Sequence, residues 1–271
     1  YVGNVQWQAA AMGSPYLKAI VPRVIGHNLH EAPHYQGGAF QLGWTAMWSF
    51  GTDGRTAQSI DLHNWDKLFP VLPLRDLPKV AGKSMSYYQD WLDHPDYDDY
   101  WRALAIEERY GDIGVPVLQI GGWYDFFTAG TFNNFVGMRE RGGSEVARRN
   151  QKAIVGPWVH SASTLTHAGD VDFGKDSILD LRAIELQWFE RWLKGIGNGI
   201  DNEAPLRIFV MGANQWRDEQ EWPLARTTYT PFYLHSDGSA NSFAGDGKLG
   251  RQPPGDEPAD GYVYDPAFPT P

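Results

Sequence analysis

The sequence predicts an α/β domain that is interrupted by a helical segment and followed by an all-β region. Residues 115–120 and 152–155 are short apolar runs, as expected of parallel strands that are buried on both faces. Helical patterns follow both runs, and strands with turn-rich connections occupy the last part of the chain. Alternating strands and helices are typical of a parallel sheet covered by helices.

The first part of the α/β core is assigned to residues 1–28. Residues 2–12 are rich in Gln and Ala and precede Gly13, which indicates a helix with a glycine C-cap. Residues 17–24 are largely apolar, and we expect them to form a short buried strand.

A helical cap is predicted for residues 29–110. This part of the chain is rich in aromatic residues, Asp, His and Pro, unlike the segments on either side. Residues 40–50 and 65–69 have the pattern of helices. We therefore interpret the region as an insertion into the α/β core.

The second part of the core is assigned to residues 111–203. Each of the two predicted parallel strands is followed by a helix, at residues 131–141 and 177–193. In the second helix, apolar side chains recur at three- and four-residue steps, which gives the helix one apolar face.

The region 204–271 is predicted to begin a β domain. Its strands are expected at residues 206–211, 230–234 and 262–264, with Gly- and Pro-rich connections. These strands are too few to close a sandwich or barrel. We therefore expect the chain to be part of a longer protein.

Composition excludes several classes of function. The 271 residues carry a formal net charge of −10, which argues against binding to nucleic acid or to an anionic membrane surface. The chain has no cysteine, so disulfides, thiolate catalysis and cysteine–zinc sites are excluded. Its 12 tryptophans suit a carbohydrate-binding surface, an apolar substrate pocket or a large aromatic core.

An acid and a histidine follow the two predicted parallel strands. The first strand leads through Gly121 and Gly122 to Asp125, and the second leads through Gly156-Pro157 to His160. The glycines before each of these two residues are expected to form tight turns. Catalytic groups in open α/β sheets lie beyond the carboxyl ends of the strands. Asp125 before His160 is also the order of acid and histidine in Ser-Asp-His hydrolases. Taken singly, Asp125 could cap a helix and His160 could be an ordinary loop histidine; their matched positions favour catalysis.

The predicted roles of Asp125 and His160 require a serine nucleophile in addition to these two residues. His160 would take the proton from a serine hydroxyl and return it to the leaving group, while Asp125 would fix the imidazole tautomer. No serine of the chain has the Gly-x-Ser setting between a strand and a helix. A nucleophile would fit directly before the predicted helix at 2–12, at the position preceding Tyr1.

Several motifs match one family of enzymes in order along the chain. Tyr1 and Gly3 resemble the end of a Gly-x-Ser-Tyr-x-Gly nucleophile motif. The further matching stretches are residues 4–10, 17–20, Gly121-Gly122-Trp123-Tyr124-Asp125, Gly156-Pro157-Trp158-Val159-His160, 207–212, 216–219, 221–224 and 264–266. Together these stretches resemble the cocaine esterase family, which is related to X-prolyl dipeptidyl aminopeptidases and α-amino acid ester hydrolases. The resemblance covers almost the whole chain in order.

The resemblance implies a partial α/β-hydrolase domain with a helical cap insertion, followed by a partial all-β jelly-roll domain. It also implies a serine hydrolase of esters or amides that works through an acyl-enzyme, with the serine preceding Tyr1. The backbone N–H of Tyr1 would be one oxyanion donor. The given chain by itself is expected to be inactive.

The family's acyl pocket maps in part onto this sequence. Trp44 and Phe127 match aromatic pocket positions of the family's esterases. His34 stands where those esterases have a tryptophan, so the same preference for aromatic esters does not follow. Trp44 is also compatible with a role in the core of the cap.

Two alternative functions remain at this stage. The Trp-rich segments and the partial jelly roll could form a non-catalytic carbohydrate-binding module, with Asp125 and His160 structural. His27, His30 and His34 could bind a metal, although Pro33 breaks any shared helical face. The leading hypothesis remains a serine hydrolase that uses no cofactor or metal. Its substrate would be a small ester, an amide or a short peptide, and the protein could form an oligomer.

Overall fold

The computed structural model describes residues 1–54, 59–160 and 165–265. The chain divides into two compact units, which are described separately below. The first comprises Tyr1–Ile60 and Met85–Ala225, and the second comprises Asp61–Ser84 and Arg226–Pro271.

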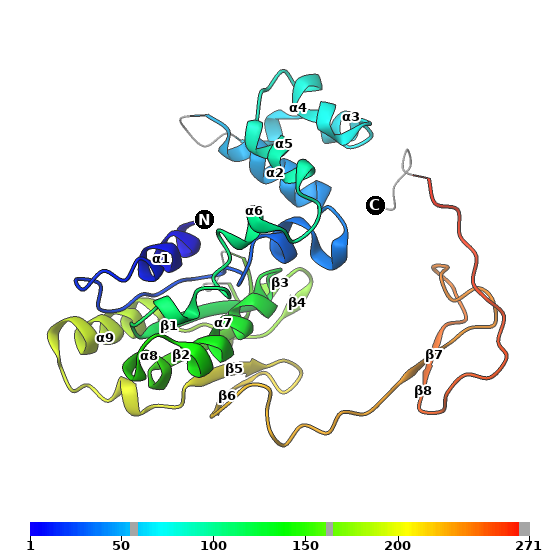
Figure 1. Ribbon diagram of the computed structural model, residues 1–271. Coiled ribbons are helices and arrows are strands. Elements are labelled where there is room, and N and C mark those ends of the chain that lie inside the picture. Colours follow the sequence, from blue (N-terminus) through cyan, green and yellow to red (C-terminus); the bar gives the residue numbers. More distant parts are fainter. Residues whose placement is uncertain (55–58, 161–164, 266–271) are drawn as a thin grey trace. The chain divides into compact units, whose positions relative to one another are not determined.

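A four-stranded sheet with the order β1-β2-β5-β6 forms the centre of the first unit (Figure 1). Strand β1 (Val117–Tyr124) pairs in parallel with β2 (Gln151–Val159), and β2 pairs in parallel with β5 (Leu206–Val210). Strand β6 (Gln215–Glu219) is antiparallel to β5. The strand expected at 17–24 is reduced to isolated parallel bridges from Ile20 and Arg23 to β1.

Helices cover both faces of this sheet. On one face, Trp7, Ala10 and Ala11 of α1 (Val2–Ala11) share a core cluster with Met138 of α7 (Thr128–Arg141). On the other face, α9 (Leu181–Lys194) buries Leu181 and Trp188 against strand residues such as Leu118 and Ile154. The apolar steps predicted for this last helix therefore face the sheet, although the helix begins later than residue 177 because Asp180 caps it.

Both central strands run further than their apolar patterns indicated, and this corrects the prediction that glycines form turns before Asp125 and His160. Gly121 and Gly122 lie inside β1, and Gly156 lies inside β2. A Cβ on Gly122 would lie 2.2 Å from the carbonyl oxygen of Trp158, and one on Gly156 would lie 2.3 Å from the Trp158 ring. These glycines are therefore needed for close packing around Trp158 rather than for turning the chain.

Strand β5, predicted as the first strand of the β domain, instead pairs with the α/β sheet. Its register with β2 includes Ala153 with Leu206 and Val155 with Ile208. Sheet pairing thus continues past residue 204, and the domain boundary placed there stays a prediction. The later strands are β7 (Tyr233–His235) and β8 (Lys248–Gly250), an antiparallel pair in the second unit. Residues 262–264, expected to be a strand, are irregular.

The predicted insertion consists of short helices throughout its described part. Helix α2 (Leu42–Thr52) is the longest of them, and it corresponds to the helix expected at 40–50. The others are α3 (Trp65–Leu68), α4 (Leu77–Val80), α5 (Ser86–Asp93) and α6 (Asp99–Arg102), and short helical turns lie at His30–His34, Gln36–Gly38, Ile60–Leu62, Leu74–Asp76 and Tyr110–Asp112.

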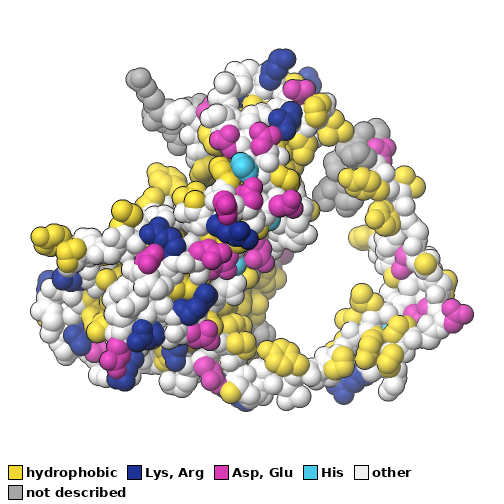
Figure 2. Space-filling view, viewed as in Figure 1, with side chains coloured by type: hydrophobic (Ala, Val, Ile, Leu, Met, Phe, Trp, Pro, Cys, Tyr) yellow, Lys and Arg dark blue, Asp and Glu magenta, His cyan; other side chains and the backbone are white. Residues whose placement is uncertain are grey.

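The remaining elements are small. They are α8 (Glu145–Arg149), a hairpin of β3 (His167–Ala168) and β4 (Val171–Asp172), and helical turns at Lys175–Ser177 and Ile200–Asn202. Basic and acidic side chains are interspersed on the face seen in Figure 2. In the part of the chain that the structure describes, every helix is too short or too polar to cross a membrane.

Candidate active site

Asp125 and His160 lie directly beyond the ends of β1 and β2. The two strands are neighbours and parallel, and their last paired residues are Tyr124 and Val159. The next residue after Val159 is His160, and the next after Tyr124 is Asp125, so both side chains emerge at the same sheet edge. The Asp125 carboxylate accepts a hydrogen bond through Oδ2 from Nδ1 of His160, over 2.8 Å.

The carboxylate of Asp125 is held inside the protein. Only 1% of its side chain is exposed, and its second oxygen accepts a hydrogen bond from the backbone N–H of Phe127, over 2.7 Å. The chain turns here into α7, whose first residue, Thr128, donates from its hydroxyl to the Asp125 carbonyl, over 2.5 Å. The acid therefore shapes the start of the helix and also binds the imidazole, so the structural and catalytic readings of Asp125 are compatible.

Within the described part of the chain, one nitrogen of the His160 imidazole is hydrogen-bonded and the other has no partner. A hydrogen bond from Nδ1 to a carboxylate leaves Nε2 as the basic nitrogen of the neutral ring. Among the described residues, Nε2 has no recorded hydrogen-bond partner, and 41% of the side chain is exposed. Ser161 and Ser163 lie outside the described residues. The ring can therefore accept a proton from a group on its open side.

A pocket of about 550 Å³ opens beside His160. Its wall combines the start of α1, the segment next to β1, the middle of β1, the end of β2 and α9. The lining residues are Tyr1, Val2, Gly3, Gln6, Val21, Arg23, Val24, Ile120, Gly121, Trp158, Val159, His160, Leu181, Glu185 and Phe189. The first residues of the helix at Val2 thus face the same space as the histidine.

Tyr1 occupies the N-cap position of α1. Its carbonyl accepts the first hydrogen bond of the helix, from Val5 over 3.1 Å, and Tyr1 lines the pocket that His160 also lines. The N–H groups at the start of a helix have no partner within the helix and are available to bind an anion. The proposed oxyanion role of Tyr1 is compatible with this placement.

Three aromatic rings lie close to the imidazole of His160. The ring centroid of Trp44 lies 6.0 Å away, that of Phe127 5.7 Å and that of Phe126 5.2 Å. Trp44 and Phe127 were both expected near the site from the sequence. Phe126 was not, although its position directly after Asp125 was a usable signal.

His34 has all its recorded contacts within the insertion. Its ring stacks on Trp91 at 4.0 Å, and its Nδ1 lies 3.2 Å from the hydroxyl of Thr45. Burial, with a smaller contribution from His30, lowers the pKa of His34 to about 3, so the ring is neutral in the folded protein. These contacts do not include His160, and a substrate-binding role for His34 stays a prediction.

The three histidines considered as metal ligands have separate partners. His30 contacts the carbonyl of Pro95 through Nε2, and His34 contacts Thr45. His27 lies apart, with Nε2 3.2 Å from Glu31 and 3.6 Å from Glu107. Within the described residues, no group of three or more His, Cys, Asp or Glu side chains is arranged to hold a metal ion.

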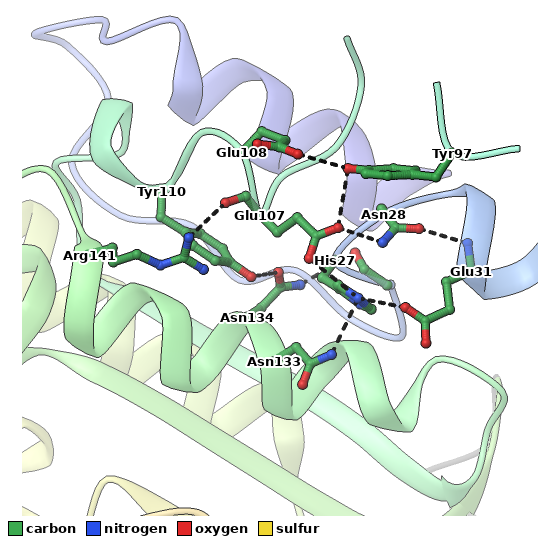
Figure 3. A network of polar contacts seen from close by, with 11 residues as sticks. His27, Asn28, Glu31, Tyr97, Glu107, Glu108, Tyr110, Asn133, Asn134 and Arg141 are labelled. Atoms are coloured by element: carbon green, nitrogen blue, oxygen red, sulfur yellow. Dashed lines mark hydrogen bonds and ion pairs between the residues drawn. The ribbon is translucent and has the colours of Figure 1, made fainter. Parts of the chain in front are cut away.

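His27 belongs instead to a polar network that joins the two ends of the insertion to α7 (Figure 3). The His27 carbonyl accepts from the N–H of Ile106, over 2.8 Å, and Asn133 of α7 lies 3.3 Å from the His27 ring. Beside it, the Tyr110 hydroxyl donates to Asn134, over 2.8 Å. The network fixes where the insertion leaves and rejoins the core.

Two family models match the chain. The X-Pro dipeptidyl-peptidase (S15 family) model matches residues 1–162, and the X-Pro dipeptidyl-peptidase C-terminal non-catalytic domain matches residues 198–269.

Curated relatives include a cocaine esterase of Rhodococcus sp. (strain MB1 Bresler), which is 36% identical over 292 residues and matches 100% of this chain. A putative serine esterase of Mycobacterium bovis is 26% identical over 172 residues, or 62% of this chain. The chain spans 49% of the first relative and 23% of the second.

Solved structures share the fold. An α-amino acid ester hydrolase aligns with a TM-score of 0.76 at 24% identity, over 99% of this chain and 45% of that one. An aminopeptidase from a marine-sediment Thaumarchaeota archaeon aligns with a TM-score of 0.75 at 21% identity, over 99% of this chain and 44% of that one. Together with the two family models, these likenesses confirm the predicted fold class, an α/β domain followed by a C-terminal β domain.

Proposed function

Because the chain belongs to the X-Pro dipeptidyl-peptidase (S15) family of hydrolases, we propose that Asp125 and His160 are the acid and base of a serine esterase or peptidase. The family match covers both residues and agrees with the resemblance seen in the motifs. The observation that carries the proposal is the hydrogen bond from His160 Nδ1 to the buried Asp125 carboxylate, which leaves Nε2 available beside the pocket.

The chemistry would proceed through an acyl-enzyme. Nε2 of His160 takes the proton of a serine hydroxyl as its oxygen attacks the substrate carbonyl. The Asp125 carboxylate stabilises the resulting imidazolium and keeps its orientation. The imidazolium then protonates the leaving alcohol or amine, and a water molecule activated by the same nitrogen releases the acyl group.

The nucleophile is proposed to be a serine directly before Tyr1. This position would place it between a strand and α1, as in a nucleophile elbow. Tyr1, Val2 and Gly3 line the pocket that His160 lines, so a residue joined to Tyr1 would be near the histidine. In that setting the Tyr1 peptide N–H would stabilise the oxyanion, and one such donor contributes about 2.7–4 kcal/mol to transition-state stabilisation.

The substrate is proposed to be a small ester, an amide or a short peptide. Trp44 and Phe127 lie within 6.0 Å of the His160 ring, centroid to centroid, and would supply apolar contacts for the acyl group. The mechanism uses only side chains and backbone groups, and it requires no metal or organic cofactor.

The test is covalent labelling by a fluorophosphonate probe of the polypeptide encoded by the gene extended upstream of Tyr1. We expect labelling of the serine that precedes Tyr1, hydrolysis of simple acyl esters or X-prolyl peptides, and loss of both in His160→Ala. The 271-residue chain alone should not be labelled. A folded, extended protein that neither reacts with the probe nor hydrolyses these substrates would contradict the proposal.

A further inference from the structure

We propose that Phe126 is a positioning residue for His160, and that Trp44 of the insertion holds Phe126 in place. The inference rests on the proposed function, in which His160 is the base. It concerns what keeps the imidazole oriented, which the hydrogen bond to Asp125 alone cannot explain.

A single hydrogen bond fixes one atom of the imidazole but not the plane of the ring. Oδ2 of Asp125 holds Nδ1, and the ring can still rock about this contact. The Phe126 ring lies nearly parallel to the imidazole, with an interplanar angle of 12° and centroids 5.2 Å apart. An offset stack of this kind restricts the plane of the ring and so directs Nε2.

The other two aromatic neighbours are poorly oriented for this role. The Phe127 ring is inclined by 46° to the imidazole, and the Trp44 ring is inclined by 60°. Their centroids also lie further from the imidazole than that of Phe126 does, at 5.7 and 6.0 Å against 5.2 Å. Phe126 is therefore the residue whose face supports the imidazole.

Phe126 is itself held between two rings. Its centroid lies 4.5 Å from that of Trp44 on α2 and 4.4 Å from that of Phe127. Phe126 is partly buried and packs against the core cluster under α1 and α7. Ring contacts from Trp44 to Phe126 and from Phe126 to His160 therefore connect the helical insertion to the proposed base. A shift of α2 would then change the orientation of the imidazole.

This arrangement predicts which kinetic constant should change. A misplaced base slows proton transfer in the transition state and leaves ground-state binding of the substrate nearly unchanged. Phe126→Leu, in the extended polypeptide described above, should lower kcat on the order of 10- to 100-fold, with KM changed by less than about twofold. Phe126→Tyr retains the ring and should recover most of kcat.

A second measurement does not depend on the nucleophile. In the 271-residue chain with ¹³C-labelled histidine, NMR relaxation gives the order parameters of the His160 Cδ2–H and Cε1–H bonds. We expect them to fall in Phe126→Leu and to return in Phe126→Tyr. Phe40→Leu is the matched control, because Phe40 is also a partly buried ring, with Tyr35 and Tyr88 of the insertion as neighbours, and should leave His160 unchanged.

The two measurements separate the possible failures. If the extended wild-type protein is neither labelled nor active, the proposed function fails, and the order parameters still decide the role of Phe126. If Phe126→Leu keeps wild-type order parameters at His160, or lowers kcat no more than Phe40→Leu does, the inference about Phe126 is wrong. Should Phe126→Leu not fold, as judged by circular dichroism, Phe126→Met makes the same comparison.

Discussion

Oδ2 of Asp125 lies 2.8 Å from Nδ1 of His160, across the ends of two adjacent parallel strands. The acid is buried, with 1% of its side chain exposed, whereas His160 is 41% exposed. A buried carboxylate needs partners because its desolvation is costly. Asp125 finds them in the imidazole and in the N–H of Phe127, so the catalytic and the structural contributions of this acid can be separated by substitution.

Asp125→Asn should abolish most of the proposed activity without unfolding the protein. The amide can keep contact with the N–H of Phe127, but it no longer favours the tautomer that leaves Nε2 basic. In the polypeptide extended upstream of Tyr1, without the probe, we expect kcat to fall about 10⁴-fold, as in serine proteases. Asp170→Asn, at an exposed acid between β3 and β4, is the control and should keep wild-type kcat. More than a tenth of the activity remaining in Asp125→Asn would contradict the assigned role.

Gly122→Ala should destabilise the sheet at the site. The added Cβ would meet the Trp158 carbonyl oxygen at 2.2 Å and its carbon at 2.8 Å, and backbone atoms must then shift. We expect the free energy of unfolding to fall by about 1–3 kcal/mol in urea denaturation. Gly197→Ala is the control, since a Cβ there meets nothing within 4 Å and should change stability by less than about 0.5 kcal/mol. Equal free energies of unfolding for the two variants would show that the close packing around Gly122 does not require a glycine.

The order of elements and the position of the proposed site could be predicted because they depend on local patterns. Buried parallel strands give continuous apolar runs, and the residues after such runs must lie at one edge of the sheet. These patterns predict that Asp125 and His160 lie together, and in the structure a hydrogen bond joins them. The glycines before them were misread as turns, since a sequence does not show that the Trp158 ring and carbonyl lie against them.

Contacts between segments that are distant in the sequence are harder to predict. The strand at Leu206–Val210 was recognised, but its apolar pattern suits either a β domain or a neighbour of β2, and only the pairing decides. Phe126 is not singled out by the sequence, because nothing in it distinguishes an aromatic residue that packs in a core from one that stacks on an imidazole. The sequence also does not show that His34, placed in the acyl pocket by the resemblance, is buried against Thr45 and Trp91; its substrate-binding role stays a prediction.

The buried, neutral His34 should make stability depend on pH. Its pKa is lowered to about 3, mainly by burial, while in the unfolded chain it is about 6.5. Between these values the unfolded state binds the extra proton, so the free energy of unfolding falls as pH falls. The stability that depends on a neutral His34 is fully present above about pH 6.5. Between pH 7 and pH 5, the free energy of unfolding falls by about 2 kcal/mol for this reason.

Urea denaturation at pH 7 and pH 5 tests this dependence on His34. The variant His34→Gln can keep a hydrogen bond to Thr45 but cannot titrate, so its difference in stability between the two pH values should be smaller than that of the wild type by about 2 kcal/mol. His167→Gln, at an exposed histidine in β3, should retain the wild-type difference. A His34→Gln protein with the wild-type difference would show that other groups cause the acid sensitivity.

Tyr110→Phe should weaken the attachment of the insertion to α7. The Tyr110 hydroxyl donates to Oδ1 of Asn134 over 2.8 Å, and both residues are buried, with 2% and 0% exposed (Figure 3). Removing the hydroxyl leaves a buried acceptor unsatisfied, which costs about 1–3 kcal/mol of unfolding free energy. Tyr229→Phe, at a tyrosine that is 79% exposed, should cost nothing measurable. Adding Asn134→Leu to Tyr110→Phe removes the unsatisfied oxygen. The double variant should therefore lose less stability than the sum of the losses in the two single variants. Strictly additive losses would contradict a direct interaction between these two side chains.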